Sequence, residues 1–340
     1  MFFNSAAFKL GKLPRYDSRT ICPTVTLLDA HATVPWPNGK KFAFTIFDDT
    51  DHQDRVNVPP VYDFLQQHGL ITTKSVWPLK GRETPLIGGL TCEDEDNRQW
   101  LLKLQNLGYE IALHNVTFHT SLRAETGRGL DRFQALFGAD PKTMANHADC
   151  RESIYWGDQR LSGIRRRLYN LLTRNRNRGR FRGHIAGSPL YWGDFCKERI
   201  TYVRNFVFQE TNTLKACPVM PYHDAQRPDV NFWFASTEGS DVAAFTSAIS
   251  EARQDRLETE GGACIMYTHF ASGFYQDGRL NPQFAALIKR LAAKDGWFVP
   301  VGTLLDHIRQ VQGDYTLSGR DRSRLEWKWL RHKMASGGTR

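Results

Sequence analysis

Residues 41–49 read Lys-Phe-Ala-Phe-Thr-Ile-Phe-Asp-Asp, an apolar run that ends in two acids. A short run of this kind predicts a strand that is buried on both faces, as in a parallel sheet. We expect this strand to end at Asp48 and Asp49, where the chain opens into a loop.

The rest of the chain alternates between strand and helix patterns. Such alternation predicts parallel strands that are joined by crossover helices. The strands are expected at 70–77, 109–113, 142–145, 230–235, 263–267 and 297–299, and the helices at 61–68, 97–107, 130–137, 241–258, 282–293 and 302–310.

Two features of this pattern favour a β/α barrel. No Gly-x-Gly-x-x-Gly turn follows the first strand, which weakens a dinucleotide-binding reading. Polar residues also follow the strands, and in a β/α barrel the carboxyl ends of the strands share the rim that holds the active site. These residues are Asp48, Asp49, His114, His147 and His269. We therefore expect one α/β domain over 1–340, with a barrel core at 41–310, an irregular insertion at about 151–227 and a basic C-terminal tail at 314–340.

Three groups of residues near these strand ends are candidates for metal-assisted chemistry. Adjacent carboxylates repel each other, so Asp48 and Asp49 need a cation or a specific hydrogen-bond network. His114 and His119 can share a metal only if their segment forms a loop, and His269 can protonate a leaving amine near neutral pH. Each group alone has a simpler reading, as loop acids or as structural histidines. Their order along one barrel favours a single mechanism.

The same three segments resemble the polysaccharide deacetylase family, carbohydrate esterase family 4. Thr45-Ile-Phe-Asp-Asp49 is similar to the family's Thr-Phe-Asp-Asp segment, and the segment from His114 to His119 resembles its His-Ser/Thr-x-x-His segment with one extra residue. Tyr267-Thr-His269 is similar to the late apolar-x-His segment. The resemblance implies a distorted β/α barrel. It also implies that Asp48 is the general base, that His269 is the general acid and that the metal ligands are Asp49, His114 and His119.

The family's Arg-x-Pro-Tyr segment, which orients the base, has no clear match in this sequence. Residues 145–149 stand in its place, so we expect a divergent member of the family. The resemblance implies one divalent ion, expected to be zinc, and removal of an N-acyl group from an amino sugar, a glycan or a lipid-linked saccharide. Further candidates for the pocket wall are His147, Tyr222, His223 and Asp224.

Charge and cysteine content bear on partners and location. The net charge is +9, and no acidic residue lies between Arg160 and Arg182, which favours an anionic membrane surface and, less strongly, nucleic acid. The 6 cysteines form no Cys-x-x-Cys pair, which is typical of a reducing compartment. The first residues also lack a secretory pattern. We expect a cytoplasmic enzyme, peripheral to the inner face of the membrane.

Two other functions remain open from the sequence. One is a catalytically inactive barrel that binds a saccharide or an anionic lipid, because the third family segment is changed. The other is a phosphate- or nucleic-acid-binding protein that uses the Arg-rich segment. Neither alternative predicts hydrolysis of an amide.

Overall fold

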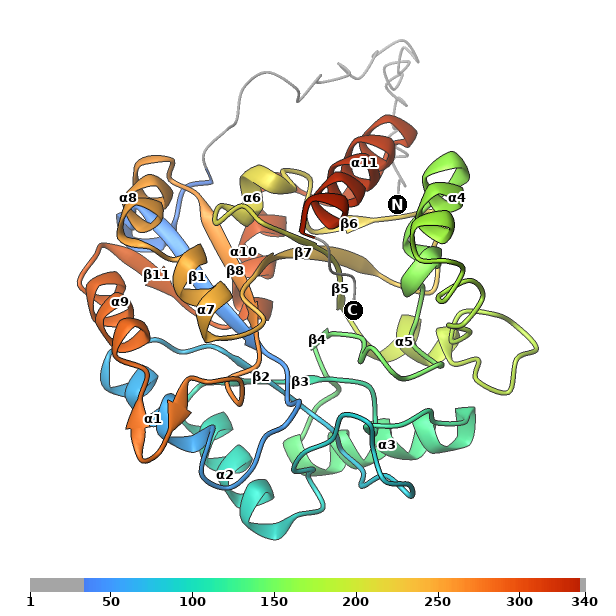
Figure 1. Ribbon diagram of the computed structural model, residues 1–340, viewed down its shortest axis with the longest axis horizontal. Helices are drawn as coiled ribbons and strands as arrows, with labels where there is room; N and C mark the ends of the chain where they lie inside the picture. Colours follow the sequence, from blue (N-terminus) through green and yellow to red (C-terminus); the bar gives the residue numbers. More distant parts are fainter. Residues whose placement is uncertain (1–33, 337–340) are drawn as a thin grey trace, which may run out of the picture. The chain divides into compact units, whose positions relative to one another are not determined.

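The computed structural model describes residues 34–336, whose strands close into a parallel barrel (Figure 1). Each strand pairs in parallel with the next around the ring, and the last pairs with the first. In ring order the strands are β1 (Phe42–Asp48), β2 (Thr73–Val76), β3 (Glu110–Leu113), β4 (Thr143–Met144), β5 (Tyr202–Phe208), β7 (Phe232–Glu238) and β8 (Ala263–Thr268). The barrel predicted from the sequence is confirmed.

Short strands extend the ring at two places. A parallel strand joins β1, and an antiparallel strand joins β7 and carries a further short strand on its other side. A separate hairpin lies outside this sheet. These strands are β11 (Gly296–Phe298), β6 (Tyr222–His223), β12 (Tyr315–Thr316), β9 (Tyr275–Gln276) and β10 (Arg279–Leu280).

Helices surround the strands, as Figure 1 shows for α1, α2, α3, α8 and α9. The sequence marks several of their ends: α1 begins with two prolines, and Gly138 ends α3 in the left-handed conformation, with φ 78°. The helices are α1 (Pro59–Gln67), α2 (Glu95–Asn106), α3 (Arg123–Phe137), α4 (Gly163–Leu172), α5 (Gly193–Arg199), α6 (Thr213–Ala216), α7 (Val242–Ala248), α8 (Glu251–Thr259), α9 (Pro282–Ala292), α10 (Val301–Gln312) and α11 (Gly319–Ser336), with 3₁₀ turns η1 (Pro37–Gly39) and η2 (Gly157–Arg160). Among residues 34–336, none of the helices combines the length and the apolar character needed to cross a bilayer.

β1 lies at the centre of this arrangement. All seven of its residues are buried. β2 and β8 flank the strand, the outer helices cover one of its faces, and side chains in the barrel interior cover the other. This double burial explains why the strand has a continuous apolar run rather than an alternating pattern. Its carboxyl end delivers the acids at 48–51 to the rim of the barrel.

Two expected elements differ from the observed ones. The barrel strand β5 lies inside 151–227, the range expected to be an insertion, so the irregular part ends before Tyr202. The polar residues Arg204 and Asn205 interrupt its apolar run. For this reason the sequence pattern did not predict the strand. The single helix expected at 241–258 is two helices, because Ile249 and Ser250 leave the helical conformation between α7 and α8.

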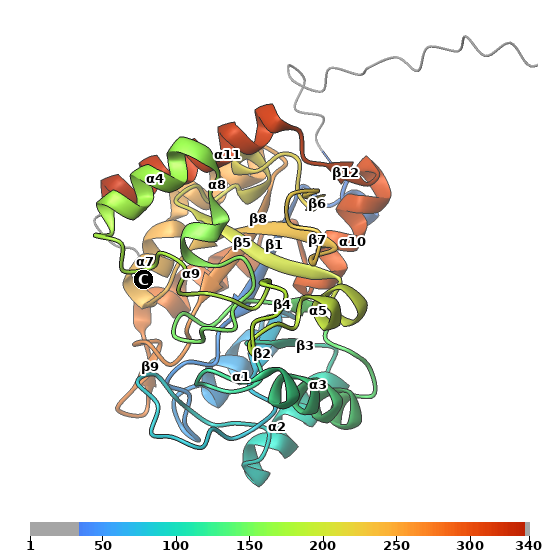
Figure 2. The ribbon, with the colours of Figure 1, turned by 90° about the vertical axis from the view of Figure 1, so that its right-hand side faces the viewer.

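The expected basic tail at 314–340 includes the long helix α11, which packs against α4 and β5 (Figure 2). Trp329 is buried, with its ring 5.7 Å from that of Tyr169 and 5.8 Å from that of Phe206. The buried Glu326 accepts a hydrogen bond from Arg165 at 2.6 Å. Within residues 314–336, the tail is therefore a structural part of the domain.

Candidate metal centre

Three side chains from three barrel loops form the candidate metal site. Asp51 follows β1, His114 follows β3 and His147 follows β4. The Asp51 Oδ1 atom lies 3.2 Å from His114 Nε2 and 3.6 Å from His147 Nε2, and the three ligand atoms all lie within 4.8 Å of one another. Ligands about 2.1 Å from one tetrahedral ion lie about 3.4 Å apart, so the spacing fits a shared ion.

Each histidine has a partner on Nδ1, the ring nitrogen that does not face Asp51; for His147 it is Cys150 Sγ at 3.4 Å. His114 Nδ1 lies 3.1 Å from the carbonyl oxygen of Ala145, so an N–H on Nδ1 can donate there and leave Nε2 facing Asp51. Such a backbone partner is usual for metal-binding histidines. Asn115, at φ 54°, turns the chain sharply after β3, and its Oδ1 accepts the backbone N–H of His147 at 2.9 Å. This turn brings the two loops together.

The charge states of the cluster suit a divalent ion. Burial opposes ionisation of Asp51, but the imidazoles of His114 and His269 hold its pKa well below the usual range. Burial lowers the pKa of His147 to about 4, which keeps its imidazole in the neutral form that binds metals. Asp51 Oδ1 and His147 Nε2 are buried without a hydrogen-bond partner. Unpartnered buried atoms are costly, and a metal ion would satisfy both.

His269 lies on the other side of Asp51. Its Nε2 is 3.4 Å from Asp51 Oδ2, and its Nδ1 is 2.8 Å from the carbonyl oxygen of Ser240. Burial works to lower the pKa of His269, but Asp51 and Asp49 raise it to about 9. The two carboxylates therefore favour the protonated imidazole, which can act as a proton donor.

Asp49 faces a buried arginine from the opposite wall of the barrel. Arg204 on β5 donates from Nη1 to Oδ1 at 3.1 Å and from Nη2 to Oδ2 at 2.5 Å. Asp49 Oδ1 also lies 3.9 Å from His114 Nδ1. A bidentate pair of this kind fixes a carboxylate in one orientation. Asp49 thus lies beside the cluster with its charge balanced by protein.

Asp48 points away from this cluster. Its Oδ2 lies 2.9 Å from Lys74 Nζ and accepts a hydrogen bond from the Tyr62 hydroxyl at 3.1 Å, while its Oδ1 accepts the Phe270 N–H at 2.9 Å. Successive side chains of a strand point to opposite faces, so Asp48 and Asp49 face different surroundings. Burial raises the pKa of Asp48, although Lys74 opposes the shift. The expected general base is enclosed in a buried ion pair.

His119, an expected metal ligand, is not brought into the cluster. Its Nε2 accepts the backbone N–H of Arg82 at 2.8 Å, and its Nδ1 lies 3.0 Å from the carbonyl oxygen of Thr120. The segment after β3 does form a turn, as expected, but this turn directs His119 away from His114. His147, expected only in the pocket wall, is the second histidine of the cluster.

The other three pocket candidates lie on and after the short outer strand β6. The Tyr222 hydroxyl accepts a hydrogen bond from Asn205, and His223 Nδ1 lies 3.1 Å from the carbonyl oxygen of Asn231. Asp224 pairs with Arg227 and Arg322. These contacts fasten β6 and α11 to the barrel, and none of the three residues joins the metal cluster.

Sequence reasoning missed Asp51 and Arg204. Asp51 carried a signal, because in an extended segment it shares a face with Asp49 and not with Asp48. Arg204 carried a weaker signal: it is a lone cation inside Tyr-Val-Arg-Asn-Phe-Val-Phe, residues 202–208, a segment otherwise typical of a buried strand. A buried cation of this kind requires a carboxylate partner.

Comparisons with known proteins identify the fold. No family model matches the chain, and no curated protein matches it. A solved structure from Mycobacterium smegmatis, assigned provisionally to the polysaccharide deacetylases, is similar at a TM-score of 0.50 with 16% identity, and the match covers 84% of this chain and 97% of that one.

Two further solved structures are similar at a TM-score of 0.46 and 11% identity. One is PuuE allantoinase, with 81% of this chain and 92% of that chain covered. The other is from Pseudomonas aeruginosa PAO1, also assigned provisionally to the polysaccharide deacetylases, with 81% and 93% covered. The Mycobacterium smegmatis structure confirms the barrel type that the sequence resemblance implied.

Proposed function

We propose that this protein is a metal-dependent hydrolase that removes an N-acyl group from an amino sugar or a related saccharide. The observation that carries the proposal is the buried set of Asp51, His114 and His147 at the rim of a barrel of the polysaccharide deacetylase type. One carboxylate and two imidazoles, with positions left for water and substrate, are a usual donor set for catalytic zinc. The proposed ion is therefore zinc.

These three residues would hold the ion, and His114 and His147 would do so through Nε2. When bound, such an ion supplies a Lewis acid that polarises an acyl oxygen and acidifies water. The remaining work falls to side chains of this protein. The ligand set differs from the set implied by the sequence resemblance, since Asp51 replaces Asp49 and His147 replaces His119.

Asp49 is the proposed general base. The bidentate contact with Arg204 holds its carboxylate beside the cluster, where it can take a proton from the attacking water. Asp48 is less suited to this role, because it points to the opposite face of the strand end, where Lys74, Tyr62 and Phe270 enclose it. Arg204 would then do the orienting work of the family's missing arginine.

His269 is the proposed general acid. Its Nδ1 is anchored at Ser240, so Nε2 is directed toward Asp51 and the cluster. A protonated imidazole at this place can give its proton to the departing amine as the carbon–nitrogen bond breaks. The products are a free amine and a carboxylic acid.

A cytoplasmic location is part of the proposal. The five cysteines within residues 34–336 are buried free thiols, a state that suits a reducing compartment. Fractionation of cells that express the full chain, with the protein detected by antibody, tests this location. Recovery of the protein on the outer side of the cell membrane or in the medium would contradict it, whereas recovery at the inner face of the membrane would not.

The direct test is release of acetate from N-acetylglucosamine oligomers. We expect turnover by the purified protein, loss of turnover after treatment with a chelator and recovery on addition of Zn²⁺. Asp51→Asn should be inactive under all three conditions. A metal-loaded, folded protein that hydrolyses no N-acylated sugar would favour the alternative of an inactive, saccharide-binding barrel.

A further inference from the structure

Helix α4 exposes an apolar stripe on the outside of the domain. Ile164, Leu171 and Leu172 are 54%, 73% and 54% exposed. Because an α-helix turns about 100° per residue, positions i, i+7 and i+8 lie on one face. The buried side of the helix carries Arg165 and Tyr169, which contact Glu326 and Trp329 of α11. Ile164 and Leu171 therefore lie on the side away from α11. Leu172 is seven positions from Arg165 and lies at the border between the two sides, where it is still exposed.

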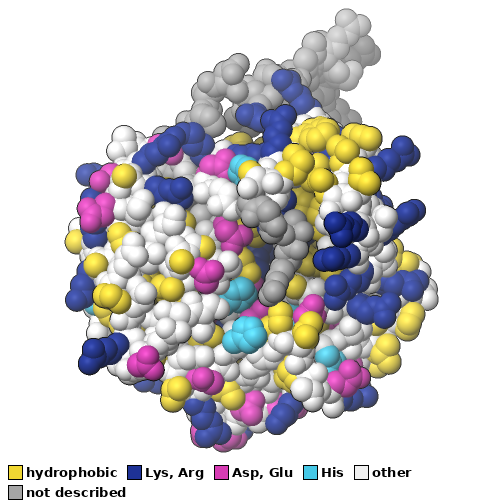
Figure 3. All heavy atoms as spheres, viewed as in Figure 1, with side chains coloured by type: hydrophobic (Ala, Val, Ile, Leu, Met, Phe, Trp, Pro, Cys, Tyr) yellow, Lys and Arg dark blue, Asp and Glu magenta, His cyan; other side chains and the backbone are white. Residues whose placement is uncertain are grey.

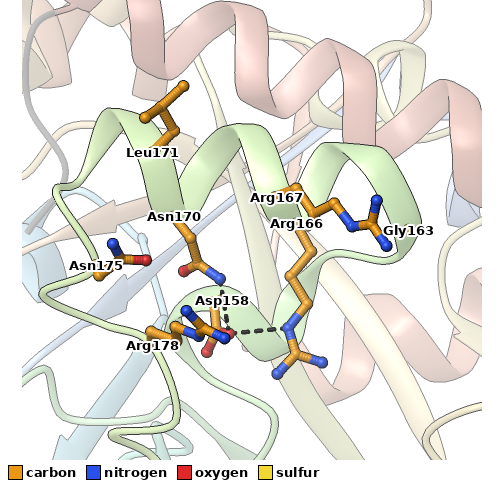
Figure 4. A pocket seen from close by; sticks show the side chains of 8 residues that line it. All are labelled: Asp158, Gly163, Arg166, Arg167, Asn170, Leu171, Asn175 and Arg178. Carbon is orange, nitrogen blue, oxygen red and sulfur yellow. Dashed lines mark hydrogen bonds and ion pairs between the residues drawn. The ribbon is translucent and has the colours of Figure 1, made fainter.

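A hollow of about 420 Å³ lies beside this stripe (Figure 4). The buried Asp158 lies in its wall and accepts hydrogen bonds from Arg166 at 2.8 Å and from Asn170 at 3.3 Å. The charge of Asp158 is thus balanced by Arg166. Arg167 and Arg178 also line the hollow, and neither forms an ion pair within residues 34–336.

The loop that follows α4 adds to the positive charge. Arg174 and Arg176 are exposed, and no acidic residue occurs from 160 to 182. Figure 3 shows hydrophobic and basic side chains side by side over the region of α4 and α11. A helix with an apolar face and flanking arginines is typical of proteins that lie in a membrane interface.

The structure divides the arginines of this segment into two groups. Arg165 pairs with Glu326 and Arg166 pairs with Asp158, so both serve the fold. Arg160 is buried, with its guanidinium carbon 3.2 Å from the centre of the Trp156 ring. Arg180 pairs with Asp149. The exposed arginines of the segment that form no ion pair within residues 34–336 are Arg167, Arg174, Arg176, Arg178 and Arg182.

We propose that this surface docks on a bilayer that contains anionic phospholipids. Leu171 and Leu172 would enter the interface, and Arg167 and Arg178 would bind a lipid phosphate in the hollow. The apolar stripe favours a bilayer over a free phosphate, because a dissolved anion would leave Leu171 and Leu172 exposed to water. None of these residues belongs to the metal cluster, so the inference does not depend on the proposed hydrolysis.

The test is co-sedimentation of the full-length protein with vesicles of phosphatidylcholine alone or with about one third phosphatidylglycerol. We expect binding to the anionic vesicles only. Arg167→Gln with Arg178→Gln should weaken this binding roughly thirty-fold, since each basic side chain near such a surface contributes modestly but additively. Leu171→Ser with Leu172→Ser should weaken it at least roughly tenfold.

A matched control removes two exposed basic charges elsewhere. Arg253→Gln with Lys289→Gln changes α8 and α9, at the opposite edge of Figure 1 from α4, and should bind vesicles as wild type does. Circular dichroism and melting temperature verify the fold of each variant. The proposal is overturned by equal binding to both vesicle types, by equal binding of all variants or by binding of inorganic phosphate without binding of vesicles.

Discussion

Arg204 Nη2 lies 2.5 Å from Asp49 Oδ2, and both side chains are buried beside the candidate metal cluster. The pair joins opposite walls of the barrel, since Asp49 follows β1 and Arg204 belongs to β5. The pair helps to explain how the adjacent carboxylates of Asp48 and Asp49 can both be buried. Asp49 is balanced by Arg204 and Asp48 by Lys74, so the repulsion between the two carboxylates is offset on both faces of the strand end.

The Arg204–Asp49 pair predicts a loss of turnover when its geometry is broken. Arg204→Met should lower kcat by about 10²-fold or more with little change in KM, because the proposed base is no longer held in place. Arg204→Lys keeps the charge but loses the bidentate contact. Its kcat should lie between those of wild type and Arg204→Met. Steady-state kinetics and metal content measure both effects. Unchanged kcat in a folded Arg204→Met protein would remove Asp49 from the role of base.

The Asp48–Lys74 pair predicts a loss of stability instead. Lys74→Met leaves a buried, uncompensated carboxylate and should cost about 3–5 kcal/mol, measured by urea denaturation. The double variant Lys74→Met with Asp48→Asn should recover part of this loss, and both variants should retain the metal. A stable, metal-loaded Asp48→Asn protein without turnover would instead support Asp48 as the general base.

The strands that could be predicted are those with uninterrupted apolar runs, such as β1 and β8. β5 could not be recognised in the same way, because two polar residues interrupt its apolar run: Arg204 pairs with Asp49 in the barrel, and Asn205 donates to Tyr222 of β6. The sequence also gives little indication of the break between α7 and α8. Ile249 and Ser250 occur in helices as well, and the interruption depends on how the two helices pack against the barrel.

The candidate site was predicted in its location and only partly in its composition. Strand ends predicted the rim that holds His114, His147 and His269. The choice between His119 and His147 depends on the path of two loops, which a single sequence does not specify. The choice between Asp49 and Asp51 depends on which acid meets Arg204, a contact across the barrel between distant parts of the chain.

Glu152 predicts a specific dependence of stability on pH. Burial raises its pKa to about 7, above the value of about 4.5 for an unfolded chain. The folded state therefore binds the proton more tightly, and this stabilisation is present below about pH 4.5 and is lost as the pH rises through about 7. The whole loss is about 3 kcal/mol, and most of it falls between about pH 4.5 and 7. Between pH 6 and 9, wild type should lose about 1 kcal/mol relative to Glu152→Gln.

Melting temperatures of both proteins, measured with a chelator present, test this dependence. Glu152→Gln is a suitable comparison because it cannot ionise and its amide oxygen can still accept from Asn115, which lies 2.8 Å from Glu152 Oε1. A constant difference between the two melting temperatures across this range would contradict the raised pKa.

Helix α11 predicts that the C-terminal region contributes to stability. Trp329 is 1% exposed, so Trp329→Ala should destabilise the protein by about 3–5 kcal/mol through loss of burial and creation of a cavity. Met334→Ala, at a residue that is 53% exposed on the same helix, should have little effect. If the two variants were equally stable in urea denaturation, α11 would not unfold together with the rest of the domain, and this prediction would be wrong.

The metal ligand set is the centre of the account, and metal content per chain tests it most directly. Mass spectrometry of the purified proteins should find about one zinc ion in wild type and in His119→Ala. Asp51→Ala and His147→Ala, purified in the same way and verified as folded, should hold almost none. Loss of the ion in His119→Ala together with its full retention in His147→Ala would contradict the assignment.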